Sequence, residues 1–276
     1  MLSSPMSESV VDTTPTPPRG ARKLAEYVVE GKTHAASAAE WDRMARIQGA
    51  RGWGTTVRTT HASRQLLLDE AEKWKLGAQA TFLSLSLAES LCATAVCAID
   101  GATGSQLSKL ELFLCTLLAK KVSGSNSEMV EGQFEYFWFD NMLKKGARIG
   151  RMSVKAFAAL ERDTLHRLDW RMHRATTVDF IYYLAVREHC SGDLQPYSCK
   201  WDELCAATIK RARFWSFVSG DVADGALLAA LSLADVRRLC GLVAWPRRLA
   251  RITGFASESI VVHLAALHAK HDNVRL

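Results

Sequence analysis

Apolar residues recur at helical spacing along almost the whole chain from residue 21 onward, and no run alternates with period two for long enough to indicate a strand. This pattern predicts a short helix over residues 37–48, followed by two sets of helices. The first set is expected over 62–75, 79–98, 105–123, 127–144 and 151–169. The second set is expected over 176–190, 198–218, 222–241, 246–253 and 257–270. The connections are short, so consecutive helices should pack against each other.

Signals for helix ends support these segments. Ser37, Thr103 and Ser125 are each followed three residues later by Glu or Gln, which is the spacing of a capping box at a helix start. Pro246 suits the first turn of a helix, and Gly254 suits the residue that ends one. Together the signals predict an all-α fold.

The composition divides the chain into four parts. Residues 1–20 are rich in Ser, Thr and Pro and are expected to form a disordered tail. An N-terminal segment with the short helix follows over 21–58. The two sets of helices then predict one unit over 59–174 and a second over 175–276, although the residues of the two sets show little internal similarity.

Overall composition is that of a globular protein. The 276 residues are 48% hydrophobic and 23% charged, with 35 Lys and Arg against 29 Asp and Glu, a net charge of +6. The longest apolar stretch, Thr81 to Ile99, contains Ser, Thr and Glu89, so it predicts a buried helix and not a membrane span. No secretory signal is recognisable, and the seven cysteines include no C-x-x-C pair. We therefore expect an intracellular protein without a membrane partner.

Sequence motifs of catalysis are missing. The chain contains no G-x-x-x-x-G-K-[ST], H-E-x-x-H or G-x-S-x-G, and its eight histidines are scattered. The sequence therefore predicts no catalytic residue, no metal and no cofactor. An enzyme on an unfamiliar helical scaffold stays as a weaker alternative.

Two charged residues stand out because they occupy apolar stripes. Lys121 continues the stripe of Leu114, Leu117 and Leu118 in segment 105–123. Glu161 lies in the stripe of segment 151–169, four residues after Phe157 and four before Leu165. A charge on a buried stripe is costly unless it is paired. Two plainer explanations stay open: Lys121 offsets the negative end of its helix, and Glu161 lies at a wet rim.

The sequence around these two residues resembles the cyclin family, in particular A- and B-type cyclins. LELFLCTLLAKK (Leu110 to Lys121) resembles the third cyclin helix with its terminal lysine, and LERDTLHRLDWRMHRATTVDFI (Leu160 to Ile181) resembles the stretch from the cyclin glutamate into the second repeat. WPRRLARITGFASESI (Trp245 to Ile260) resembles the end of that repeat, and KWKLGAQAT (Lys73 to Thr81) the junction of the first two helices. The resemblance covers about residues 60 to 270 in collinear order.

The resemblance implies a tandem pair of five-helix cyclin boxes that binds and activates a cyclin-dependent protein kinase in cell-cycle control. It implies that the chain is a regulatory subunit and not an enzyme, acting in the nucleus or the cytoplasm. The positions that match kinase-binding positions of the family are Lys121, Glu161, Val122, Leu165, Trp170 and Met172.

The chain departs from the family at the substrate-docking patch, which carries M-R-A-I-L and a Trp in cyclins. One alignment places Thr59 to Ser63 there, so that the patch is lost. The other aligns RQLLLD (Arg64 to Asp69), leaves a degenerate patch of Arg64, Leu67 and Leu68, and allows Arg64 to pair with Glu89. The Met and the Trp are missing in both alignments.

A basic stretch favours a second function mildly. Residues 141–175 hold nine Lys or Arg against three acids, a plausible footprint for phosphates. The alternative is therefore a cyclin-fold protein resembling transcription factor IIB, which would bind DNA and the transcription machinery. The N-terminal region lacks zinc-ribbon cysteines, so nucleic acid is the less favoured partner. Phosphorylated or acidic proteins are a third use for the charge.

Overall fold

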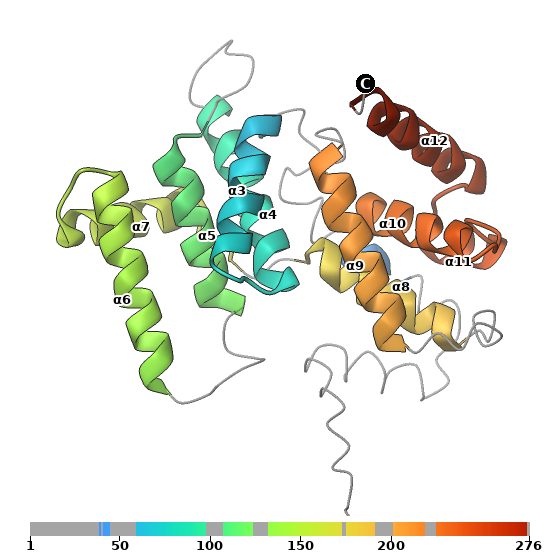
Figure 1. The fold of residues 1–276 in the computed structure, drawn as a ribbon, viewed down its shortest axis with the longest axis horizontal. Helices are drawn as coiled ribbons and strands as arrows, with labels where there is room; N and C mark the ends of the chain where they lie inside the picture. Colours follow the sequence, from blue (N-terminus) through green and yellow to red (C-terminus); the bar gives the residue numbers. More distant parts are fainter. Residues whose placement is uncertain are drawn as a thin grey trace, which may run out of the picture.

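The computed structural model describes residues 39, 41–44, 59–97, 107–123, 132–172, 175–190, 201–218 and 225–274. These described residues form helices joined by turns, with no strand among them, so the predicted all-α class is confirmed (Figure 1). The first set comprises α3 (His61–Lys73), α4 (Ala78–Cys97), α5 (Lys109–Ser123), α6 (Gly132–Ile149) and α7 (Val154–Arg167). The second comprises α8 (Thr177–Cys190), α9 (Trp201–Val218), α10 (Gly225–Leu239), α11 (Arg247–Thr253) and α12 (Ser257–Val274).

Helix α5 is the centre of the first set. Every residue from Leu112 to Ala119 is buried, and α3, α4 and α6 pack around the helix. A helix that is covered on all sides must be apolar on all sides, and this segment carries only Thr116 as a polar residue. The hydroxyl of Thr116 donates to the carbonyl of Leu112, so its polarity is satisfied within the helix.

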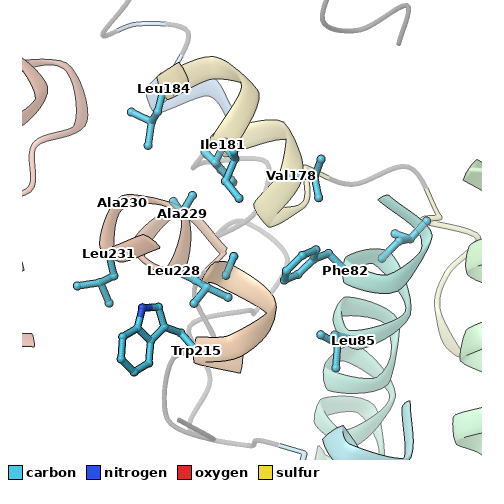
Figure 2. Close-up of a cluster of buried hydrophobic side chains, with 14 of the residues drawn as sticks. Phe82, Leu85, Val178, Ile181, Leu184, Trp215, Leu228, Ala229, Ala230 and Leu231 are labelled. Atoms are coloured by element: carbon cyan, nitrogen blue, oxygen red, sulfur yellow. The ribbon is translucent and has the colours of Figure 1, made fainter. Parts of the chain in front are cut away.

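Helix α10 has the same place in the second set. All residues from Leu228 to Arg237 are buried, and α8, α9 and α12 pack around it. Figure 2 shows Ile181 and Leu184 of α8, Trp215 of α9 and Leu228 of α10 gathered in one apolar cluster. The third helix is therefore the central one in both sets.

Hydrogen bonds and apolar packing connect the two sets of helices. The ring of His61 in α3 hydrogen-bonds through Nε2 to the carbonyl of Phe217 in α9, at 2.9 Å. The amide of Gln79 in α4 donates to Asp179 in α8, at 3.1 Å. Figure 2 shows Phe82 pointing from α4 toward the second set, and it belongs to the same apolar cluster as α8 and α10.

Trp41 belongs to a helical turn over residues 41–44, inside the short helix that the sequence predicts. Its side chain is 2% exposed, although it precedes the first set along the chain. The indole packs against Phe180 and Tyr183 of α8, with ring centroids 4.9 and 5.7 Å away, and against Phe255 at 6.1 Å. The N-terminal turn is thus attached to the second set.

Several helix ends differ from the prediction, among them the start of α7 at Val154 and the end of α12 at Val274, and two of the differences have a visible cause. Helix α5 begins at Lys109 and not at 105, because Ser108 and Glu111 form the capping box: the Ser108 amide donates to the Glu111 carboxylate at 2.9 Å, and the Glu111 amide donates to the Ser108 hydroxyl at 3.2 Å. Helix α6 continues past 144 to Ile149 because Gly146 does not break it. Gly146 instead lets the ring of Phe157 from α7 lie against the α6 backbone.

Four of the described helices, α3, α6, α7 and α10, end in the same hydrogen-bonded turn, a Schellman motif. In α6, for example, the amide of Met152 bonds to the carbonyl of Ala147 at 2.9 Å. The motif needs a residue with positive φ, which favours glycine. Only α10 uses a glycine, Gly241; the residues at the other three ends are Lys75, Arg151 and Asp169, with φ of 50°, 50° and 54°.

Other sequence predictions lie outside the described residues. They include the Ser/Thr/Pro tail over 1–20 and the capping boxes that begin at Ser37, Thr103 and Ser125. Within the described ranges no single helix has the length and apolar character to cross a membrane; α11 and α12 pass that test only when taken together, bent by 96° where they meet.

Candidate functional site

Lys121 and Glu161 form an ion pair, with Nζ of Lys121 2.5 Å from Oε1 of Glu161. Lys121 comes from the last turn of α5 and Glu161 from the middle of α7. The lysine side chain is 36% exposed and the glutamate side chain 12% exposed. The structure thus brings together the two charges that the sequence placed on apolar stripes, and the pair sits at a boundary between core and solvent.

Aromatic rings of α6 lie beneath this end of α5. The Lys121 ammonium lies 5.9 Å from the ring centroid of Phe139, and the Lys120 ammonium lies 6.0 Å from that of Trp138. Both rings are half-buried and contact each other edge to face at 5.0 Å. A cation over an aromatic face is attracted by the ring electrons, so α6 helps to hold both lysines in place. The sequence argument passed over these rings, although the aromatic run before Asp140 was a visible signal.

Trp170 follows α7 and is 56% exposed, the largest side chain among the exposed hydrophobic residues. Its backbone amide bonds to the carbonyl of Leu165 at 2.9 Å, and its indole donates to Nδ1 of His166 at 3.3 Å. The ring is therefore held outward by fixed contacts. Leu165, whose carbonyl accepts that bond, and Val122 at the end of α5 are half-buried and pack on the core. An aromatic side chain with apolar neighbours is typical of the centre of a protein interface.

Met172 has a different environment from the one that the resemblance implies. Its side chain is only 7% exposed and belongs to the main apolar cluster. Because little of it reaches the surface, Met172 acts chiefly in packing, and it supports the segment that carries Trp170.

The predicted docking patch is not a surface patch. Arg64, Leu67 and Leu68 are 3%, 1% and 9% exposed, so they belong to the interior of the first set. Arg64 donates to Glu89 at 2.7 Å and to the hydroxyl of Thr59 at 3.0 Å. The pairing of Arg64 with Glu89 is the one that the second alignment allowed. The prediction of a docking patch is therefore wrong, because a guanidinium that is buried and held by these partners is not available to a substrate.

A shallow depression lies between α3 and α5, next to that interior. The exposed apolar residue there is Leu66, at 41%, which the sequence argument did not select. The lining is mostly apolar, with one cation and one carboxylate: Leu66, Leu67, Glu70, Lys109, Leu112, Phe113, Thr116 and Ile149.

Glu70, at the edge of the depression, is held by two donors. Its carboxylate accepts from Nζ of Lys145 and from the indole of Trp74, each at 2.8 Å. Burial alone would raise the pKa of Glu70, but these hydrogen bonds outweigh it and hold the pKa below the ordinary value. The Lys145 ammonium also lies 4.4 Å from the Trp74 ring centroid. The carboxylate therefore ties α3 to α6.

A second buried carboxylate, Asp235 of α10, has a structural environment. It is fully buried and lies 2.9 Å from Arg211 of α9, 3.4 Å from Arg238 and 3.0 Å from His268 of α12. These contacts join the central helix α10 to α9 and α12. The network lies in the second set, away from the Lys121–Glu161 pair.

The described residues offer little for catalysis. Among them no group of three His, Cys, Asp or Glu side chains is placed to hold a metal ion. Burial raises the pKa of the Cys92 thiol to about 11, which disfavours its reactive thiolate. What these residues provide is a partly exposed ion pair between α5 and α7 and an outward-facing tryptophan on the segment after α7, and both features can take part in binding a partner.

Comparisons with known proteins assign no family. No family model matches the chain, and no curated protein matches it closely enough to show a relationship.

Proposed function

We propose that the chain is a cyclin-type regulatory subunit that binds and activates a cyclin-dependent protein kinase. The observation that carries the proposal is the ion pair between Lys121 and Glu161 at the end of α5, with the exposed Trp170 on the segment that follows α7. In the family that the chain resembles, the residues at the Lys121 and Glu161 positions anchor backbone groups next to the mobile C-helix of the kinase, and the residue at the Trp170 position packs on that helix. The proposal rests on the resemblance and on this placement.

The charges have a physical use in such an interface. Each is partly exposed, so each has hydrogen-bonding capacity left for backbone groups of a partner while the other neutralises it. Trp170, Leu165 and Val122 would supply apolar contact area around them. The subunit would activate the kinase by binding its active conformation more tightly than its inactive one. The catalytic lysine, aspartate and Mg²⁺ would all belong to the kinase.

The arrangement of the helices supports a tandem of two cyclin boxes over 59–174 and 175–276. In each set of five, the third helix is the central one, and three of the others pack around it. Equivalent roles for α5 and α10 are what a duplicated unit predicts. Such a subunit acts in the nucleus or the cytoplasm, and we expect this chain there.

Co-expression with the cyclin-dependent kinases of the source organism tests the proposal. A stable complex with kinase activity is expected with at least one of them. Trp170→Ala should weaken that complex at least tenfold, because exposed aromatic anchors dominate interfaces. Val243→Ala is the matched control, since Val243 is a 70% exposed apolar residue of the second set. If no kinase binds, or if both variants bind as wild type does, the proposal fails.

A further inference from the structure

The basic stretch over 141–175 divides into paired and unpaired cations. Lys144, Lys145, Arg167 and Arg171 lie within 2.9 Å of the carboxylates of Asp140, Glu70, Glu111 and Asp169, in that order. Arg174 is outside the described residues. In the part of the chain that the structure describes, the others form no ion pair, and all are exposed: Arg148, Arg151, Lys155 and Arg162.

Three of these cations gather where α6 turns into α7, and we call Arg148, Arg151 and Lys155 the basic turn. Arg148 is in the last turn of α6, Arg151 closes that helix, and Lys155 is in the first turn of α7. Arg162 lies two helical turns further along the same face of α7, about 10 Å from Lys155. Figure 1 shows the turn at the edge of the first set that is remote from α8–α12.

Local structure accounts for only part of the charge at this turn. A lysine in the first turn of a helix opposes the helix dipole, and α7 has no acidic residue there to offset it. Arg151 has φ of 50°, a backbone conformation in which glycine is more stable. Arg148 and Arg151 stabilise the carboxyl end of α6, where the helix dipole is negative. The positive amino end of α7, however, then lies next to three positive charges, those of Arg148, Arg151 and Lys155. An anion at the turn would relieve this arrangement.

The surroundings favour a protein segment over a nucleic acid. Val154 lies between Arg151 and Lys155 and is 42% exposed, so an apolar side chain interrupts the cations. Asp163 follows Arg162 and is also exposed, and it would repel a continuous phosphate backbone. Strong DNA binding draws on many phosphate contacts along the duplex, whereas the basic turn can serve one phosphate or two.

We propose that the basic turn binds a phosphorylated serine or threonine in a protein segment, with an apolar neighbour of that residue on Val154. The guanidinium groups of Arg148 and Arg151 can each donate two parallel hydrogen bonds to phosphate oxygens, and Lys155 adds a point charge. The proposal is independent of kinase binding. The basic turn and Trp170 lie at opposite ends of α7, whose 14 residues span about 21 Å.

The test measures binding of the full chain to peptide libraries by fluorescence anisotropy. One library is fixed only at a central phosphothreonine, and its counterpart has threonine there. A single-stranded oligonucleotide is the third probe. We expect the phosphorylated library to bind at least tenfold more tightly than the other two, with an affinity that falls as salt rises. Lys155→Glu should remove most of this preference.

Arg151→Gly gives the sharper variant because it separates binding from folding. Glycine suits the positive φ at 151, so the variant should fold at least as stably as wild type and yet bind the phosphorylated library about tenfold less tightly. Lys75→Gly is the matched control: it makes the same change at the equivalent end of α3 and should leave binding unchanged. Equal binding of both peptide libraries, tighter binding of the oligonucleotide, or wild-type binding by Arg151→Gly would overturn the proposal.

Discussion

Nζ of Lys121 lies 2.5 Å from Oε1 of Glu161, across 40 residues of sequence. The contact closes the end of α5 onto the middle of α7 before any partner is present. A charge that is already paired needs less from a partner than an isolated one does, so binding does not have to supply the whole cost of desolvation. The two residues therefore act as one unit, and their substitutions should be read together.

Removal of either charge is expected to weaken the proposed kinase complex by about 2–5 kcal/mol, because partner groups are left unpaired. The effects on folding should differ between the two. Lys121→Ala leaves the largely buried Glu161 without its cation, whereas Glu161→Ala leaves a lysine that is 36% exposed and reaches water. A double variant with the charges exchanged, Lys121→Glu together with Glu161→Lys, should recover the stability of the fold but not the affinity for the kinase. Denaturant unfolding and kinase titration measure the two quantities, and wild-type affinity of both alanine variants would refute the assigned interface.

Gly146→Ala should destabilise the protein by about 1–3 kcal/mol. A Cβ at this position would overlap the ring of Phe157, which is fully buried and cannot move aside. In an ordinary helix the same change is stabilising, so the sign of the effect reports the close approach of α6 and α7. Gly77→Ala is the control, because no atom lies within 4 Å of a Cβ built there. Thermal unfolding of the two variants gives the comparison, and a stable Gly146→Ala variant would contradict the packing.

Acid should weaken the connection between α3 and α6 through Glu70. The pKa of Glu70 is lowered in the folded protein, so its contribution to stability is complete above the unfolded value of about 4.3 and is lost as the pH falls through the lower folded value. Glu70→Gln should therefore lose less stability than wild type between pH 6 and pH 3. Lys145→Met should flatten the profile in the same way, because it removes a donor that lowers this pKa. Urea unfolding at several pH values measures the slopes, and parallel wild-type and variant profiles would be the contrary result.

Glu89→Ala should cost about 3–5 kcal/mol of stability, since it strands the buried guanidinium of Arg64. Arg64→Met combined with Glu89→Leu should recover much of this loss, because apolar residues can replace a buried pair. Chemical denaturation of the single and double variants forms a cycle. A small loss of stability in Glu89→Ala would contradict this prediction, because Thr59 and water would then be enough to satisfy the buried guanidinium of Arg64.

The sequence predicted the helices well where spacing alone decides them, as for segments 62–75 and 198–218, found as α3 and α9. It failed where tertiary contact overrides a local signal. Gly146 looks like a helix breaker, and only the Phe157 ring from another helix shows why the chain keeps a glycine inside α6. The start of α5 was misplaced because two capping patterns compete there, and hydrogen bonds at Ser108 decide between them.

The candidate site shows the same division. Periodicity placed Lys121 and Glu161 on apolar stripes, which is a property of each helix alone. Whether the two stripes meet depends on the crossing of α5 and α7, which no local pattern specifies. Leu67 and Leu68 illustrate the opposite case. Their residue types fit a docking motif, but the orientation of α3 about its axis buries them and leaves Leu66 exposed.

Trp41 lies against α8 and Phe255, but the next helix that the structure describes, α3, belongs to the other set. Between the described elements the polypeptide therefore passes from one set to the other at least twice, once after Trp41 and once between α7 and α8. Two covalent crossings restrict rotation of the sets more than a single hinge does, and separation of the sets must first extract a buried indole. The two sets should accordingly melt in a single cooperative transition, and a cut between residue 44 and α3, which leaves one covalent crossing and the packing between the sets, should make that transition less cooperative.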